Sequence, residues 1–161
     1  MDKLRLICAE DDEFMKELLM ETLKMAIEDE EMPEMDIVYV ENAEKLRAAL
    51  HQAFADAVPF IILSDEHMPD GTGSAVIAEF IGDEKYQDVD WDTRLLDLAI
   101  ISGTTPFDDK GDFAISFLSK TQKDLFVILQ GMRRELKFIA KPTPPDILIE
   151  FLNGAGKGAG D

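Results

Sequence analysis

Short runs of apolar residues recur along the chain, and the segments between them place apolar residues at helical spacing. The five runs cover residues 4–9, 36–40, 60–64, 98–102 and 137–140. Each run is almost continuously apolar instead of alternating with polar residues, as in strands that are buried on both faces of a sheet. A chain that alternates such strands with helices is expected to form an α/β fold, in which helices cover both faces of a parallel sheet.

Helical spacing is clearest in the two segments that follow the first two runs. In the first segment, steps of three and four residues predict one apolar face, made of Phe14, Leu18, Leu19, Thr22, Leu23, Ala26 and Ile27. The second segment begins with Asn42 as its expected N-cap, because an asparagine side chain accepts hydrogen bonds from free amides of the first turn. Both segments are therefore predicted to be helices that pack on the sheet.

Length and composition indicate one folded domain. The 161 residues can bury one core, and 46% hydrophobic with 31% charged residues is typical of a globular protein. We predict that residues 1–153 form this domain and that the glycine-rich residues 154–161 form a flexible tail. No apolar stretch approaches the roughly 20 residues that cross a bilayer, and the first residues do not resemble a signal peptide. A cytoplasmic location without membrane contact is expected.

The chain is strongly acidic, with 34 Asp and Glu residues against 16 Lys and Arg residues and a formal net charge of −18. This charge repels the phosphate backbone, so direct binding of nucleic acid is not expected, and cations or basic protein surfaces are better candidates. Cys8 is the only cysteine and lies in the first apolar run. A buried, inert thiol is predicted, and a cysteine-based metal site is disfavoured.

Polar residues of complementary chemistry lie at the ends of four runs, namely Glu10, Asp11 and Asp12, then Asp65, then Ser102, then Lys141. Because the carboxyl ends of parallel strands meet at one edge of a sheet, these groups are expected to converge. Clustered carboxylates need a cation or protons, and compact Mg²⁺ suits carboxylates together with a phosphate oxygen. A hydroxyl and an ammonium can hold the remaining phosphoryl oxygens, and an aspartate can act as the nucleophile. The set predicts a site that handles phosphoryl groups.

None of these features is specific by itself. An acidic triplet also complements the dipole of the helix that follows it, and a serine or a lysine–proline pair after a strand is common in turns. His67 has no second ligand at metal-binding spacing. The prediction depends on the joint occurrence of the four chemical types at four strand ends.

The four strand-end segments resemble those of receiver domains, the phosphoacceptor modules of two-component response regulators. They read ICAEDDEFMKELL, IILSDEHMPDGTG, AIISGT and FIAKP, and the most specific pattern is Asp-x-x-Met-Pro-x-x-x-Gly, from Asp65 to Gly73. The resemblance implies that residues 1–153 are a receiver domain in a phosphorelay. It also implies the family fold, a five-stranded parallel sheet in the order 2-1-3-4-5, and a cis bond between Lys141 and Pro142.

The resemblance also implies how the phosphoryl group would be received. Asp65 would accept it from a phosphohistidine of a sensor histidine kinase or a phosphotransfer protein. Mg²⁺ would be held by Glu10, Asp11, Asp65 and the backbone carbonyl of His67. Ser102 and Lys141 would bind the phosphoryl oxygens.

The resemblance further implies a conformational switch that follows phosphorylation. Ser102 and Phe138 would move together and change the surface near the fourth and fifth strands, while Gly103 and Thr104 would modulate the site. The only chemistry expected of the chain is its own phosphorylation and dephosphorylation. The output would be binding to an unidentified partner, and homodimer formation stays open.

Two segments are longer than in typical receivers. Between Ser102 and Lys141 we predict an enlarged helical region, with helical spacing over residues 124–136 and a break near Thr121. It could serve as an added packing element or as a partner surface. Residues 83–93 are predicted to form a mobile acidic loop, in which Trp91 is either an anchor or a contact.

Two other functions stay open. A pseudo-receiver would use the same fold as a constitutive interaction module, although such a module does not need the whole site. An aspartate-nucleophile phosphatase of the haloacid dehalogenase kind would carry a second aspartate two residues after the nucleophile, where this chain has His67. A calcium-binding EF-hand loop starting at Asp65 is excluded, because its third and fifth positions would be His67 and Pro69.

Overall fold

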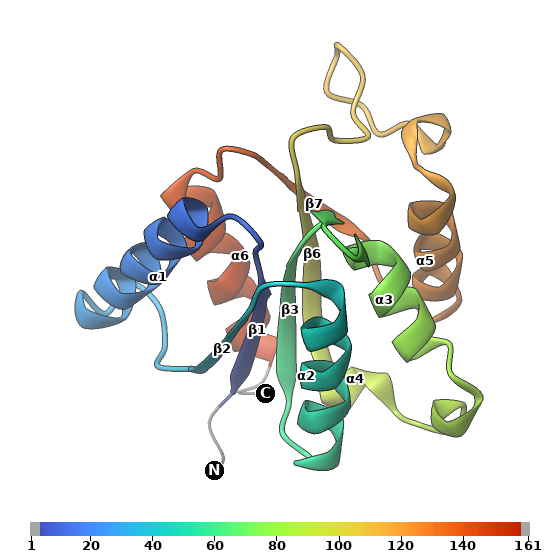
Figure 1. Ribbon diagram of the computed structural model, residues 1–161, viewed down its shortest axis with the longest axis horizontal. Coiled ribbons are helices and arrows are strands. Elements are labelled where there is room, and N and C mark those ends of the chain that lie inside the picture. Colours follow the sequence, from blue (N-terminus) through green and yellow to red (C-terminus); the bar gives the residue numbers. More distant parts are fainter. Residues whose placement is uncertain (1–3, 159–161) are drawn as a thin grey trace.

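Five parallel strands form the central sheet of the computed structural model, which describes residues 4–158 (Figure 1). They are β1 (Arg5–Ala9), β2 (Asp36–Val40), β3 (Phe60–Asp65), β6 (Leu95–Ser102) and β7 (Lys137–Ala140), and their spatial order is β2-β1-β3-β6-β7. Counted among these five alone, the order is the expected 2-1-3-4-5. The labels β4 (His67–Met68) and β5 (Gly71–Thr72) belong to a small antiparallel hairpin after β3.

Helices cover both faces of the sheet, as the alternation of segments predicts. Helices α1 (Glu13–Glu28) and α6 (Pro145–Gly158) lie on one face, and α2 (Ala43–Ala55), α3 (Gly73–Ile81) and α5 (Lys120–Gly131) lie on the other (Figure 1). Two apolar clusters fill the two interfaces, because successive strand residues point to opposite faces. In β3, for example, Ile62 packs toward α2 and α3, and Leu63 packs toward α1 and α6. Cys8 is a free, buried thiol, as predicted.

The predicted N-cap of α2 is confirmed, whereas the predicted apolar face of α1 is buried only in part. Asn42 caps α2 as predicted, since its side chain accepts a hydrogen bond from the Lys45 amide at 2.8 Å. In α1, however, only Leu23 and Ala26 are fully buried, and Phe14 remains 72% exposed. The helix therefore contacts the sheet mainly through its C-terminal half.

The enlarged helical region predicted between the fourth and fifth sheet strands is not confirmed. The segment contains a single α-helix, α5, and a short 3₁₀ helix, η2 (Ile115–Phe117), while residues 103–114 are irregular, with bends, one turn and one isolated β-bridge. An isolated β-bridge joins Phe107 to Phe113, and the Asp108 side chain accepts hydrogen bonds from the Lys110 and Asp112 amides. Side-chain-to-backbone bonds of this kind compete with helix formation, so local turn chemistry decides the structure of the added residues.

The boundaries of α5 also differ from the prediction. A capping box on Ser119 starts the helix, so Thr121 lies in its first turn instead of at a break. The helix ends at Gly131, because Arg133 adopts a left-handed conformation and the Arg134 amide bonds back to the Leu129 carbonyl at 2.8 Å. Helical spacing of apolar residues continues to residue 136 in the sequence, but the helix does not.

Two buried aromatic side chains hold the acidic segment 83–93 against the core. The segment contains η1 (Glu84–Tyr86) and the short helix α4 (Trp91–Arg94). Tyr86 and Trp91 are buried, and the Trp91 ring lies 5.4 Å from the Phe80 ring in an edge-to-face arrangement. Trp91 is therefore an anchor of this segment.

The C-terminal helix continues beyond the predicted domain boundary. Residues 154–158, which the sequence assigns to a flexible tail, are the last residues of α6, and residues 159–161 lie outside the described part of the chain. Ala155 is buried together with Leu148 and Leu152, so the helix gains apolar contacts that offset the cost of its glycines. Within residues 4–158, no helix combines the length and the apolar character needed to cross a membrane.

Candidate functional site

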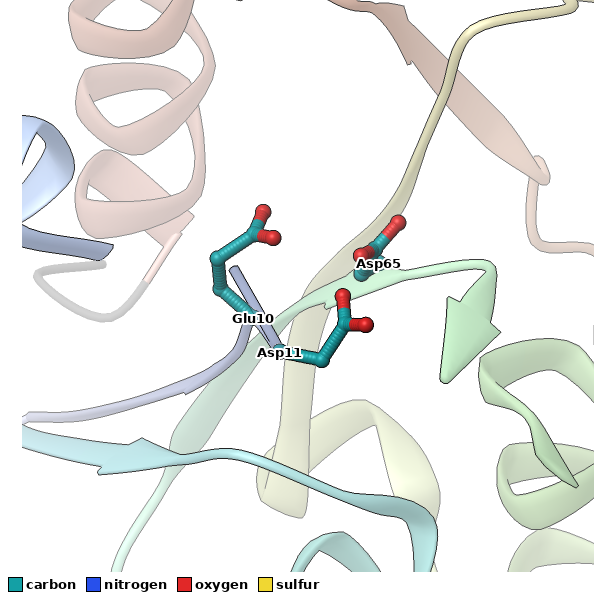
Figure 2. A group of neighbouring side chains, drawn as sticks. All are labelled: Glu10, Asp11 and Asp65. Atoms are coloured by element: carbon teal, nitrogen blue, oxygen red, sulfur yellow. The ribbon is translucent and has the colours of Figure 1, made fainter. Parts of the chain in front are cut away.

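Three carboxylates converge at the carboxyl edge of the sheet. Glu10 and Asp11 follow β1, and Asp65 is the last residue of β3, so the parallel sheet brings them to the same edge (Figure 2). One oxygen from each of the three lies within 4.8 Å of the others. Glu10 and Asp65 are buried, whereas Asp11 is exposed. The cluster is therefore reached from solvent on the side of Asp11.

Asp65 is held by a backbone that has little room to move. β3 is buried along its whole length and pairs with β1 on one side and β6 on the other. The start of α3 packs directly on this strand, since a Cβ atom built on Gly73 would lie 2.4 Å from the Asp65 carbonyl oxygen. Only glycine fits at position 73, which gives a steric reason for the last residue of the Asp-x-x-Met-Pro-x-x-x-Gly pattern.

Lys141 brings a cation into the acidic cluster. Its Nζ lies 2.9 Å from Oδ1 of Asp65 and 3.4 Å from Oε2 of Glu10. Its backbone amide donates to the Ser102 carbonyl at 3.0 Å, and the Lys141–Pro142 bond is cis, as predicted. Residues at the ends of β3 and β6 and residues directly after β1 and β7 thus meet in one site.

The cluster changes the proton affinity of its members. The pKa of Asp65 is raised to about 7, chiefly by burial and also by the hydrogen bond with Asp11 and the charge of Glu10, while Lys141 opposes the rise. Burial lowers the pKa of Lys141, but Asp65 and Glu10 outweigh that effect and hold it above the usual lysine value. One ammonium therefore does not compensate three clustered carboxylates.

A hard divalent cation fits this set of donors. Carboxylate oxygens are the protein ligands that Mg²⁺ prefers, and the exposed side of Asp11 leaves space for water or a phosphate oxygen. A cation here would also favour the ionised form of Asp65, whose pKa burial has raised. The residues present fit Mg²⁺, which the sequence predicts.

The remaining predicted residues lie beside the cluster. Ser102 is buried at the end of β6, one residue beyond the position paired with Asp65, and its hydroxyl accepts a hydrogen bond from the Thr104 amide at 3.3 Å. Phe138 lies on β7 and packs partly buried against the core. The His67 side chain is exposed, and Gly103 has open space around its Cα. Their roles in metal binding and switching stay predictions.

Glu66 is a site residue that sequence reasoning missed. It follows Asp65 directly, yet its side chain is buried and accepts three hydrogen bonds. The Ser74 amide and hydroxyl donate to it at 2.9 and 3.0 Å, and the Gln122 amide group donates as well. The Ser74 hydroxyl lies 2.7 Å from that of Thr121, which can donate to it because Ser74 uses its own proton toward Glu66. We call these four residues the Glu66 network.

The Glu66 network joins β3 to two helices. Glu66 extends from the end of β3, Ser74 lies in the first turn of α3, and Gln122 lies in the first turn of α5. From the sequence alone, a glutamate directly after an apolar strand is expected to be an exposed charged residue of a loop. The capping motif Ser119-Lys120-Thr121-Gln122 predicts the helix start, but it does not show that Gln122 turns its amide group toward β3.

Comparisons with solved structures show that the chain is similar in fold to receiver domains. No protein-family model matches the chain, and no curated protein is significantly similar to it in sequence. Solved structures of receiver domains match nearly the whole chain. A two-component response regulator from Cytophaga hutchinsonii has a TM-score of 0.62 and 16% identity over 98% of this chain and 99% of that chain.

Two further structures support this comparison. A receiver domain protein from Methanospirillum hungatei has a TM-score of 0.59 and 14% identity, and it covers 99% of this chain and 100% of that chain. The phosphorylated cyanobacterial phytochrome response regulator RcpA has a TM-score of 0.54 and 18% identity, with 98% and 93% covered. The chain therefore has the fold of a receiver domain, which is the fold that the strand-end segments imply.

Proposed function

We propose that the chain is a receiver of a two-component phosphorelay, which accepts a phosphoryl group on Asp65 from a phosphohistidine of a partner protein. One observation supports this most directly. The Asp65 carboxylate lies 2.9 Å from the Lys141 ammonium, within a cluster of two further carboxylates. Burying this many ionisable groups at one sheet edge is costly, and a role in binding a cation and a phosphoryl group accounts for it.

The proposed transfer is a displacement at phosphorus. An oxygen of ionised Asp65 forms a bond to phosphorus while the bond from phosphorus to the donor's imidazole nitrogen breaks, and that nitrogen keeps the electron pair. Lys141 neutralises an oxygen of the transferred group, and the Ser102 hydroxyl can donate to another. Mg²⁺ held by Glu10, Asp11 and Asp65 would stabilise the charge that develops on the phosphoryl oxygens. The His67 carbonyl is the fourth ligand that we propose.

The output of the proposed receiver is a change of binding surface. Phosphorylation would draw the Ser102 hydroxyl toward the new oxygens and let Phe138 follow it, with Gly103 and Thr104 setting access to the bond. The proposed donor is a sensor histidine kinase or phosphotransfer protein of the cytoplasm. We propose no activity beyond the chain's own phosphorylation and dephosphorylation.

The two other functions receive less support from the site. A constitutive interaction module has no need for Lys141 between two buried carboxylates. A phosphatase of the haloacid dehalogenase kind needs an acid two residues after its nucleophile, where this chain has the exposed side chain of His67.

Binding of beryllofluoride, an inert mimic of the phosphoryl group, tests the proposal. Adding Mg²⁺ and beryllofluoride together should raise the unfolding temperature of the wild-type protein, and the Asp65→Asn variant should not respond. Asp12→Asn is the matched control, because Asp12 caps α1 outside the cluster and asparagine is an equally good N-cap. Absence of a wild-type response, or an equal response of Asp65→Asn, would contradict the proposal.

A further inference from the structure

Strand β2 leaves one side of its backbone without a strand partner among residues 4–158. It lies at the edge of the sheet and pairs with β1 along all five of its residues (Figure 1). Natural proteins usually protect such edges with proline, lysine, a bulge or a very short strand. The sequence of β2, DIVYV, has neither proline nor lysine, and its pairing is regular. Its only charged side chain, Asp36, is paired with Arg5 on β1.

A groove runs beside this open edge. It lies between α1 and β2, has a volume of about 800 Å³, and is open to solvent. Its apolar lining consists of Met20, Ile27, Met35, Ile37 and Tyr39. Met20 is 41% exposed, and the two β2 residues, Ile37 and Tyr39, are only partly buried. Apolar surface next to free strand backbone is suited to an added strand whose alternate side chains enter the groove.

Uncompensated negative charge borders the groove. Glu17, Glu21 and Glu28 of α1 line it, and Lys24 is the only basic residue of the lining. Within the described part of the chain, none of these three glutamates forms an ion pair. A segment that enters the groove therefore meets apolar side chains below and carboxylates along α1.

We propose that the groove between α1 and β2 is a docking site for an extended basic segment of a partner protein. The segment adds to β2 as a sixth strand. The side chains on its α1-facing side, apolar and basic in turn, enter the groove, where the apolar ones meet the apolar lining and the Lys or Arg ends reach the glutamates of α1. The site uses no residue of the phosphoacceptor cluster, so this proposal does not rest on the proposed function.

A second copy of the chain is a poor occupant. Pairing of two β2 edges would bring the glutamates of two α1 helices toward each other, and each chain carries a formal net charge of −18. Like charges that face each other across an interface oppose association. The charge of the groove thus selects a basic partner.

A synthetic strand peptide whose groove-facing positions alternate valine and lysine, with threonine at the positions between them, is a direct probe, with affinity measured by calorimetry at physiological salt. The double variant Glu21→Lys/Glu28→Lys should weaken binding by about tenfold or more, as expected where charges face each other at short range. Glu84→Lys/Asp88→Lys is the matched control, because it changes the net charge equally at exposed positions outside the groove, and it should change the affinity by less than about threefold.

The following outcomes would overturn the proposal. Equal weakening by the two double variants would mean attraction to net charge alone, and absence of binding to the wild-type protein would remove the site. The same peptide with alternate backbone amides methylated, on the side that pairs, should not bind, because it cannot complete the strand ladder. If the methylated peptide binds as well as the unmodified one, or if the protein dimerises through β2 in sedimentation experiments, the proposal that a basic segment docks as a sixth strand is wrong.

Discussion

Replacing Glu66 with glutamine should destabilise the protein, although the two side chains have nearly the same shape. Oε1 of Glu66 accepts from the Ser74 amide, and the glutamine carbonyl oxygen can keep this bond. Oε2 accepts from the Ser74 hydroxyl and the Gln122 amide group. The Ser74 hydroxyl can reverse its direction and accept from the new amide nitrogen. Gln122 cannot adapt in this way, so its buried donor loses its acceptor.

The magnitude follows from that lost bond. A buried hydrogen bond to a charged acceptor contributes roughly 1.5–3 kcal/mol. The equilibrium constant of unfolding should therefore rise by about 10- to 150-fold in Glu66→Gln. Urea unfolding followed by circular dichroism measures this change as a lower midpoint with an unchanged slope.

The reciprocal double variant Glu66→Gln/Gln122→Glu supplies the control. It moves the carboxylate to position 122, where it can accept from the amide group of residue 66, and a glutamate at this third helical position still completes the capping box with Ser119. We expect it to recover at least half of the lost stability. A wild-type midpoint in Glu66→Gln, or strictly additive effects of the two changes, would refute the Glu66 network as described.

Three further predictions concern the site itself. Because the pKa of Asp65 is raised to about 7 from the usual 3.8, the folded protein binds this proton more tightly than the unfolded chain, and this contribution to stability is lost as the pH rises between those values. The unfolding temperature of Asp65→Asn minus that of wild type should therefore be larger at pH 8 than at pH 5, and an equal difference at the two pH values would contradict the raised pKa. At a concentration one hundred times its dissociation constant, Mg²⁺ should stabilise the wild-type protein by about 2.7 kcal/mol, and at a fixed concentration it should stabilise more at pH 8 than at pH 5. In thermal unfolding scans, Asp11→Asn should abolish this stabilisation. Gly73→Ala should cost about 1–3 kcal/mol or more, because its Cβ would overlap the Asp65 carbonyl oxygen, whereas Gly103→Ala, with no atom within 4 Å of its Cβ, should change the urea midpoint little.

The convergence of the site could be predicted because it depends on topology. Parallel strands place their carboxyl ends at one edge, so Glu10, Asp65 and Lys141 had to lie near each other once the alternation of strands and helices was recognised. The buried strand β3 explains how an aspartate can end an apolar run and still belong to the carboxylate cluster. Its position is set by packing, and its carboxylate emerges where the strand stops.

Other features depend on contacts between segments far apart in the sequence. The burial of Glu66 needs donors from both α3 and α5, and nothing near residue 66 indicates them. Within residues 103–119, the Asp108 side chain accepts from the Lys110 and Asp112 amides, and the local sequence does not show that these turn bonds replace a helix. The groove beside β2 arises because β2 lies at the edge of the sheet and α1 buries so few of its apolar residues.

The central claim is that Asp65 accepts a phosphoryl group, and incubation with acetyl phosphate and Mg²⁺ tests it most directly. Intact-mass spectrometry should show one added phosphoryl group on the wild-type protein and on the Asp12→Asn control. The Asp65→Asn variant should remain unmodified, and omission of Mg²⁺ should suppress the reaction. A wild-type protein that stays unmodified, or an Asp65→Asn variant that gains the same mass, would contradict the account.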